Sequence, residues 1–257
     1  MTGAAKRLGH EIALQFARHG WNVAVHYGQS KKEAQETVAA ILDLGQSAAL
    51  FCADLASETE VIALFNAIQG QMGVLDCIVN SASRFEYDRV STEPGILDSA
   101  FLQQMMQINL VAPIVLAQLL YQQHKNKTQQ GAERFDIPVV IQLLDQKLIN
   151  LNPDYFSYTL SKSALQCATH LMAMDFAPYL RVVGLAPGIS LPSGPQTDDA
   201  FQKAHTMTPL GRSSTPEDIA KTAVFIAESN AITGTTIYVD GGQHLIPSSR
   251  DVMFKTI

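Results

Sequence analysis

The segment Thr2-Gly-Ala-Ala-Lys-Arg-Leu-Gly9 places two glycines at the start of a helical pattern that runs over about residues 6–19. Glycine lets a backbone approach a ligand closely, and the free N–H groups and dipole of a helix N-terminus favour an anion such as a pyrophosphate. A glycine-containing turn before a helix is about as often a plain structural turn. The segment therefore gains its meaning from the elements that follow it.

Short apolar runs alternate with helical patterns along the rest of the chain, which is typical of βαβ units and a parallel sheet. The predicted strands are 21–27, 48–52, 75–79, 138–144, 180–186 and 236–239. The predicted helices are 6–19, 31–44, one that begins at Ser57, 97–124, 155–177 and 216–228. We expect a surface loop at 125–134 and a substrate lid at about 189–205. With no repeat or domain boundary, residues 1–257 are predicted to form one α/β domain with a Rossmann-type doubly wound parallel sheet.

The first strand of such a fold is missing from this pattern. It lies at the centre of a doubly wound sheet and leads into the phosphate loop, but here the loop begins at Thr2. An empty central position would leave backbone groups of both neighbouring strands unpaired. Either another segment fills the position or the strand lies upstream. We predict that residues upstream of Met1 complete it in the natural protein.

The composition argues against several classes of protein. Eighteen basic and 24 acidic residues give a net charge of −6, so there is no basic field for nucleic acid. We find no apolar run approaching the roughly 18 residues of a bilayer span, and no signal segment. Cys52, Cys77 and Cys167 are predicted to be reduced core residues, and the seven histidines show no ligand spacing. These features predict a cytoplasmic protein with no metal site, no nucleic-acid partner and no membrane association.

Tyr158 and Lys162 form a Tyr-x-x-x-Lys pattern on a predicted helix, which places both side chains on one face. A tyrosine with a pKa near 10 is a poor acid or base at neutral pH. An adjacent ammonium group and an oxidised nicotinamide would favour the phenolate and lower that pKa. The same spacing often arises by chance on helices, so the pair alone indicates catalysis weakly.

Seven motifs occur in the order found in the short-chain dehydrogenase/reductases. They are Thr2-Gly3 … Gly9, Asp54-Leu55, Asn80-Ser-Ala-Ser83, Asn109, Tyr158-x-x-x-Lys162, Pro187-Gly188 and Asp240-Gly-Gly242. The chain resembles this superfamily from residue 2 to about residue 245, which implies a Rossmann-type oxidoreductase. The resemblance implies that the cofactor contacts Gly3, Arg7, Leu8, His26, Tyr27, Ser30, Asp54, Leu55, Asn80, Ser81, Ala82, Tyr158, Lys162, Pro187, Gly188, Ile189 and Ser190.

Four departures from the superfamily pattern resemble pteridine reductases and bacterial dihydromonapterin reductases. They are Arg7 in place of the middle glycine, Asn80-Ser-Ala-Ser83 followed by Phe85, Asp145 in place of the serine thirteen residues before Tyr158, and His26-Tyr27 with Ser30. The resemblance implies hydride transfer from NADPH to a C=N bond of a dihydropterin, such as a dihydromonapterin, dihydrobiopterin or dihydrofolate.

The same resemblance implies a role for each catalytic residue. Tyr158 delivers the proton, and Lys162 holds the nicotinamide ribose and lowers the tyrosine pKa. Asp145 orients the substrate and joins the proton path, while Asn109 shapes the helix that anchors a water relay. The superfamily commonly forms tetramers through long helices, here 97–124 and 155–177, although packing within one subunit explains part of that apolar surface equally well.

The substitutions suit a nitrogen-rich substrate. An ionised Asp145 only accepts hydrogen bonds, whereas serine can donate one to a ketone oxygen. Ser83 is placed at the substrate, Arg7 is able to reach a cofactor phosphate and a pterin carbonyl, and Phe85 provides an aromatic wall for a flat bicycle. Each residue alone has a plainer explanation: Phe85 as core, Arg7 as a surface charge, Asp145 as a loop cap.

The end of the second strand favours NADPH over NADH. An acidic residue there would repel a 2′-phosphate, but the sequence reads His26-Tyr-Gly-Gln-Ser-Lys-Lys32. Ser30 and the two lysines can accept a phosphate, whereas the family's arginine before the serine is Gln29. The lysines also have the plain interpretation of solvated helix-start charges.

Two other functions remain open. One is a carbonyl or alcohol reductase acting on a small ketone, against which Asp145 counts. The other is a dinucleotide-binding scaffold without catalysis, against which the intact Tyr158 and Lys162 pair counts. One interpretation of the tail, residues 247–257, is that it covers the pocket of a neighbouring subunit.

Overall fold

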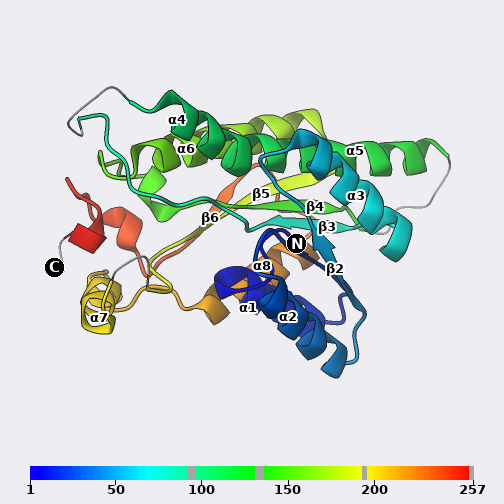
Figure 1. Cartoon of the computed structure of the whole chain (residues 1–257), viewed down its shortest axis with the longest axis horizontal. Coiled ribbons are helices and arrows are strands. Elements are labelled where there is room, and N and C mark those ends of the chain that lie inside the picture. The colour runs from blue at the N-terminus through cyan, green and yellow to red at the C-terminus, as the bar shows by residue number, and fades with distance from the viewer. Residues whose placement is uncertain (92–96, 131–135, 193–195, 255–257) are drawn as a thin grey trace.

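A parallel β-sheet runs through the molecule, and helices cover both of its faces (Figure 1). The structure is a computed structural model that describes residues 1–91, 97–130, 136–192 and 196–254. The strands are β1 (Val23–Tyr27), β2 (Ala48–Cys52), β3 (Cys77–Asn80), β4 (Val139–Leu143), β5 (Arg181–Pro187) and β6 (Thr236–Val239). This arrangement confirms the predicted doubly wound α/β fold.

Each face of the sheet buries one group of helices. One face carries α1 (Arg7–Arg18), α2 (Lys31–Asp43) and α8 (Pro216–Glu228). The other carries α3 (Glu58–Met72), α4 (Ser99–Met106), α5 (Ala112–Gln129) and α6 (Phe156–Asp175). Strands such as β4, in which all five residues are buried, read as continuous apolar runs because helices cover them on both sides.

The centre of the sheet is where the first strand of the fold is expected. The described strands form two parallel groups, β2–β1 and β3–β4–β5–β6. Met1 and Thr2 lie between them: the Met1 nitrogen donates to the Ala24 carbonyl at 2.9 Å, and the Thr2 N–H donates to the Val79 carbonyl at 3.0 Å. Two residues thus pair with both neighbours at the point where the chain enters the loop before α1.

Several predicted boundaries differ from the structure for local reasons. The prediction of a loop that begins at residue 125 is wrong for residues 125–129, because α5 continues to Gln129 with a polar, solvated surface. The rest of that loop, 131–135, lies outside the described residues. The predicted helix 97–124 is interrupted by a π-helical turn, Gln107–Val111. Residues 193–195 of the predicted lid are not described. The lid also contains α7 (Asp198–Thr206), whose N-cap residue Thr197 accepts the Ala200 N–H with its side chain at 3.2 Å.

Two other expectations are corrected. Cys52 and Cys167 are exposed and Cys77 is partly buried, so the free thiols are not core residues as a group. The helical stretch Ser99–Gln129 is long and apolar enough to cross a membrane, with a mean hydropathy of 1.4 over its most apolar window. That stretch packs against α3 and α6 here, as a core helix does.

Arg181, at the start of β5, ties the sheet to the carbonyl end of α8. Its side chain is buried and donates to the carbonyls of Ile226, Ala227, Ile232 and Ile137 at 2.8–3.1 Å. A cation is favourable at the C-terminus of a helix. The guanidinium therefore donates to four carbonyls at this end of the sheet and of α8.

Replacing this side chain should weaken the fold more than most substitutions. We expect Arg181→Met to lower the free energy of unfolding by about 3 kcal/mol, because buried carbonyls lose charged donors. Arg181→Lys keeps the charge but has fewer, less spread donors, so its loss should be smaller. Urea denaturation measures both variants, and a wild-type midpoint for Arg181→Met would contradict this role.

Candidate active site

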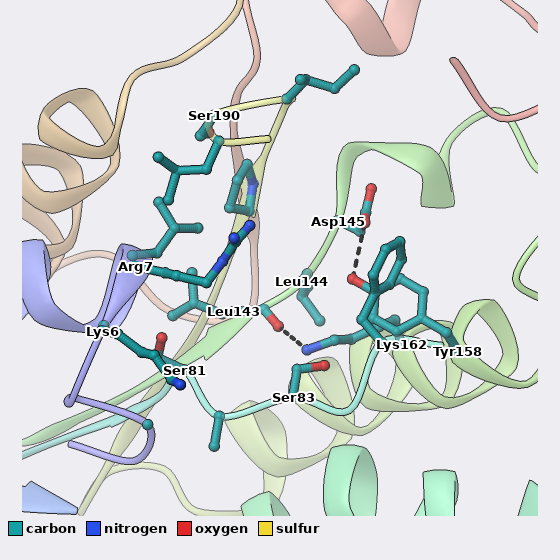
Figure 2. Close-up of a pocket in the computed structure, with 18 of the residues that line it drawn as sticks. Lys6, Arg7, Ser81, Ser83, Leu143, Leu144, Asp145, Tyr158, Lys162 and Ser190 are labelled. Atoms are coloured by element: carbon teal, nitrogen blue, oxygen red, sulfur yellow. Dashed lines mark hydrogen bonds between the residues drawn. The ribbon is translucent and has the colours of Figure 1, made fainter. Parts of the chain in front are cut away.

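A cavity of about 640 Å³ lies at the carboxyl end of the sheet, between the loop before α1 and the start of α6 (Figure 2). It brings together most of the residues predicted for the site. Those that line it are Gly3, Arg7, Leu8, Tyr27, Ser30, Ser81, Ala82, Ser83, Phe85, Asp145, Tyr158, Lys162, Pro187, Gly188, Ile189 and Ser190. The cavity follows the switch point of the sheet, where ligands bind in folds of this class.

The loop before α1 is shaped for close approach. Gly3 has φ +62°, and a Cβ there would lie 2.8 Å from the Ala82 Cα. A Cβ on Gly9 would lie 2.1 Å from the Gly3 carbonyl oxygen, so the loop and the first turn of α1 pack without room for a side chain. Lys6, the N-cap residue, makes no side-chain capping bond within the described part of the chain. This open helix start fits a bound phosphate group.

His26 supports this loop from behind and is absent from the cavity lining. The Gly3 N–H donates to its Nδ1 at 3.2 Å, and its Nε2 lies 3.1 Å from the Ala53 carbonyl. Burial lowers the pKa of His26 to about 4, so the ring is neutral and able to accept one hydrogen bond while donating another. The side chain of His26 therefore braces the loop, and its predicted cofactor contact stays a prediction.

Three other predicted residues also lie behind the cavity. Asn80, at the end of β3, is buried and donates to Gln142 Oε1 at 3.0 Å. Leu55 is buried in the core under α3, and Asp54 accepts the Ala56 N–H in the turn before that helix. None of these three side chains lines the cavity, so their predicted cofactor contacts stay predictions.

Asn109 holds the wall of the cavity in place. It is buried within the π-helical turn, its Oδ1 accepts the Arg84 N–H at 2.8 Å, and its Nδ2 donates to Ser161 Oγ at 3.0 Å. Ser83 Oγ also donates to Asn109 Oδ1, at 3.2 Å. One amide thus joins the loop after β3 to the turn of α6 next to Lys162, without lining the cavity itself.

Three of the side chains predicted to be catalytic, Asp145, Tyr158 and Lys162, gather on one side of the cavity, opposite Arg7 (Figure 2). The Tyr158 hydroxyl donates to Asp145 Oδ2 at 2.9 Å, and Lys147 N–H donates to Asp145 Oδ1 at 2.8 Å. Lys162 Nζ donates to the Leu143 carbonyl at 2.6 Å and lies 5.9 Å from the centre of the Tyr158 ring. Asp145 is therefore both a loop cap, its plainer explanation, and the partner of Tyr158.

Burial governs the titration of these groups. It raises the pKa of Tyr158 well above its ordinary value, and the charge and hydrogen bond of Asp145 raise it further. Burial also raises the pKa of Asp145, against hydrogen bonds from Lys147 and Tyr158. Burial lowers the pKa of Lys162 to about 8, although Asp145 opposes this. Desolvation and Asp145 are the main causes of the raised pKa of Tyr158 in the chain alone, so its predicted lowering by Lys162 and an oxidised nicotinamide stays a prediction.

Phe85 lines the cavity and is not a core residue, since 40% of its surface is exposed. Its ring stacks on Tyr155 with centres 4.3 Å apart and meets the Tyr158 ring edge-on at 4.7 Å. These contacts fix the orientation of the aromatic wall. Arg7, which has φ +57°, donates to the Pro192 carbonyl at 2.9 Å and so joins the loop before α1 to the segment after Pro187-Gly188.

Several residues that were not predicted for the site also line the cavity. Lys147 is one of them and is buried, and Asp251, Val252 and Met253 come from the C-terminal segment. The described part of that segment thus lies at the cavity of its own chain, and its contact with a neighbouring subunit stays a prediction. Among the described residues, no three His, Cys, Asp or Glu side chains come together as a metal site.

Comparison with known proteins agrees with this geometry. A family model described as Enoyl-(Acyl carrier protein) reductase matches residues 3–244. The 3beta-hydroxysteroid dehydrogenase 1 of Eggerthella lenta is 30% identical over an alignment 257 positions long, which covers 96% of this chain and 93% of that protein. The chain belongs to the short-chain dehydrogenase/reductase superfamily. Members of this superfamily are oxidoreductases.

Solved structures of this superfamily extend the comparison. The FolM alternative dihydrofolate reductase 1 of Brucella canis, complexed with NADP, is 34% identical, with a TM-score of 0.87 over 97% of this chain and 94% of that chain. The angucycline C-6 ketoreductase LanV with bound NADP is 25% identical, with a TM-score of 0.81 over 95% of this chain and 94% of that one. The similarity therefore spans two kinds of reductase.

The buried ammonium of Lys162 should cost the protein stability below pH 8. Its pKa is about 8 in the folded protein and about 10.5 when the chain unfolds, so the unfolded state binds more protons between these values. The free energy of unfolding should therefore rise across that window, by about 3 kcal/mol from this group. We expect Lys162→Met to lack this rise.

Chemical denaturation from pH 7 to pH 10.5 measures the difference between wild type and variant. Lys203→Met is the matched control, because Lys203 is an exposed lysine paired with Asp199 on α7. Parallel curves for wild type and Lys162→Met would show that Lys162 is protonated equally in both states.

Proposed function

We propose that this chain is an NADPH-dependent reductase that acts on a C=N bond of a dihydropterin. The observation that carries the proposal is the hydrogen bond between Tyr158 and Asp145 inside the cavity, at 2.9 Å. It places a phenolic hydroxyl beside a carboxyl group at the position where the superfamily pattern has a serine. The resemblance of the departures at Arg7, Ser83, Phe85 and Asp145 to pteridine reductases supports the same substrate class.

The titration of Tyr158 favours reduction over oxidation. Burial and Asp145 raise its pKa well above the ordinary value, so the phenol keeps its proton at neutral pH. A reduction needs a group that gives a proton to the substrate, whereas an oxidation needs a base. Asp145, whose pKa burial also raises, is placed to accept a proton from water and return it to Tyr158.

The cavity fits a nicotinamide dinucleotide, which supplies the hydride when it is bound. The open start of α1 and the glycines that exclude side chains suit its pyrophosphate. Lys162, 2% exposed and held by the Leu143 carbonyl, is placed to bind the nicotinamide ribose beside Tyr158. Tyr27, Gly28 and Ser30 line the other end, where a 2′-phosphate would lie. The solved relatives that hold NADP support this choice of cofactor.

Reduction of a ketone is the competing function, and the ketoreductase and steroid dehydrogenase relatives favour it. The carboxylate of Asp145 weighs against it, because an ionised carboxylate cannot donate a hydrogen bond to a ketone oxygen. Dihydropterins carry N–H and amino donors that such an acceptor can bind. The similarity to a dihydrofolate reductase at 34% identity adds to this preference.

We also propose a homotetramer. Leu171 and Met174 on α6 are 56% and 70% exposed in the single chain, which leaves an apolar surface for another subunit. The cytoplasmic location inferred from the sequence stays a prediction, as does the absence of nucleic-acid, membrane and metal partners.

Tyr158→Phe should remove most turnover and spare cofactor binding. The variant loses the proton donor but keeps the ring, so kcat should fall by about 10²- to 10⁴-fold. The assay is the loss of NADPH absorbance with a dihydropterin, dihydrofolate and a panel of ketones. Turnover of ketones alone would replace the proposed substrate class, and cofactor binding without turnover would indicate a scaffold. An unchanged kcat would reject the role of Tyr158.

Cofactor preference should change at Ser30. This residue precedes α2 and lines the cavity with Tyr27 and Gly28, so a carboxylate here would repel a 2′-phosphate and bind ribose hydroxyls. We expect Ser30→Asp to lower kcat/KM for NADPH relative to NADH by about 100-fold, or about 3 kcal/mol. Ser30→Thr is the matched control. Equal ratios in wild type and Ser30→Asp would place the phosphate elsewhere.

A further inference from the structure

The C-terminal segment, residues 248–254, forms part of the cavity wall. Val252 and Met253 line the cavity, and the Tyr155 hydroxyl donates to Met253 Sδ at 3.2 Å. Val252–Phe254 form a short 3₁₀ turn that lies against α7, at the same end of the molecule (Figure 1). The segment therefore closes the end of the cavity next to Tyr155 and Tyr158.

A buried carboxylate anchors the segment. Asp154 is fully buried, and its Oδ2 accepts the Arg250 Nε–H and the Asp251 N–H, both at 2.8 Å. Arg89 Nε lies 3.6 Å from the other oxygen. An unpaired charge at such a depth would be costly. The buried charge of Asp154 therefore needs Arg250 and Asp251 in these positions.

Lys147 connects the segment to the catalytic pair. Its ammonium is buried and donates to the Asp154 carbonyl at 2.5 Å and to Asp251 Oδ2 at 3.3 Å. Its own N–H donates to Asp145 Oδ1 at 2.8 Å. One residue therefore holds the carboxylate that Tyr158 bonds and the carboxylate of the C-terminal segment at the same time.

We propose that Asp251 is a positioning residue of this active site, which acts through Lys147 on the Asp145–Tyr158 hydrogen bond. The inference rests on the proposed catalytic roles of Asp145 and Tyr158. It assigns to the end of the chain a part in proton delivery, in addition to its part in the wall.

The charges around Lys147 and Asp251 decide whether Asp251 raises or lowers the pKa values of Asp145 and Tyr158. The titratable and charged groups that face Lys147 and Asp251 are Asp145, Asp154, Tyr155, Tyr158, Arg89, Arg250 and, behind Tyr158, Lys162. Burial is the main cause that raises the pKa of Asp145 and of Tyr158, and the carboxylate of Asp251 raises both further. The charge of Lys147 lowers the pKa of Asp145. The carboxylate of Asp251 in this position therefore helps keep the proton on Tyr158.

Neutralising Asp251 should move the pH dependence of the reaction. In Asp251→Asn the negative charge is lost, so Tyr158 gives up its proton at lower pH. We expect the basic limb of the pH profile of kcat to fall by about one pH unit. Asp251→Glu keeps the charge and should keep the limb. Glu217→Gln, which removes a carboxylate from an exposed ion pair with Lys221 on α8, is the control for net charge.

A second readout needs no turnover. In protein labelled with ¹³C at the aspartate carboxyl carbons, the Asp145 signal is assigned by its loss in Asp145→Asn. Its titration midpoint should fall by about one unit in Asp251→Asn and stay in place in Asp251→Glu. Asp251→Ser removes the same charge with a smaller side chain and replaces Asp251→Asn if that variant does not fold.

The outcomes separate this inference from the proposed function. If the wild type reduces ketones and no dihydropterin, the substrate class fails, and the pH profile is measured with the ketone. If it reduces neither, the proposed function fails and the carboxyl titration decides about Asp251. An unmoved Asp145 titration, or a loss of kcat that is equal at every pH, would overturn the positioning role.

Discussion

The hydrogen bond from Tyr158 to Asp145 joins two acids that are both buried, and this is the constraint on which the site depends. Two neighbouring acids in a medium of low polarity do not both ionise, so the pair retains a proton. The Tyr158 hydroxyl donates to Asp145 Oδ2 at 2.9 Å, and both residues line the cavity. The Tyr158–Asp145 pair therefore carries one proton beside the place where a hydride acceptor would be bound.

Backbone atoms, which do not take up the proton, hold Asp145 and its neighbour Lys162 in place. The Lys147 N–H donates to Asp145, and the Leu143 carbonyl accepts from Lys162. Both groups belong to one stretch of chain that runs from the end of β4 into the next turn. Because β4 is buried over its whole length, the sheet positions the start of this stretch. The end of β4 therefore helps set the positions of Asp145 and Lys162.

Much of the fold could be predicted because its signals are local. The helix Pro216–Glu228 and the strand Thr236–Val239 have the predicted bounds, since a Thr215 capping box and short apolar runs mark them. The C-terminal segment could not be predicted. Its position depends on Arg250 bonding a carboxylate 96 residues earlier, and such a contact leaves no periodic pattern in the sequence. The extension of α5 escaped prediction because a solvated helix end needs no apolar stripe.

The site was predicted best where residues contact the cavity and worst where they support it. His26 and Asn109 belong to the family pattern, yet the structure places both behind loops, where each joins two segments of the chain by hydrogen bonds. A motif marks a position that matters without saying whether it touches a ligand. The physical difference is burial combined with hydrogen bonds to two separate segments, which hold a loop in place rather than a substrate. Lys147 is also buried, bonds Asp145, Asp154 and Asp251, and lines the cavity as well.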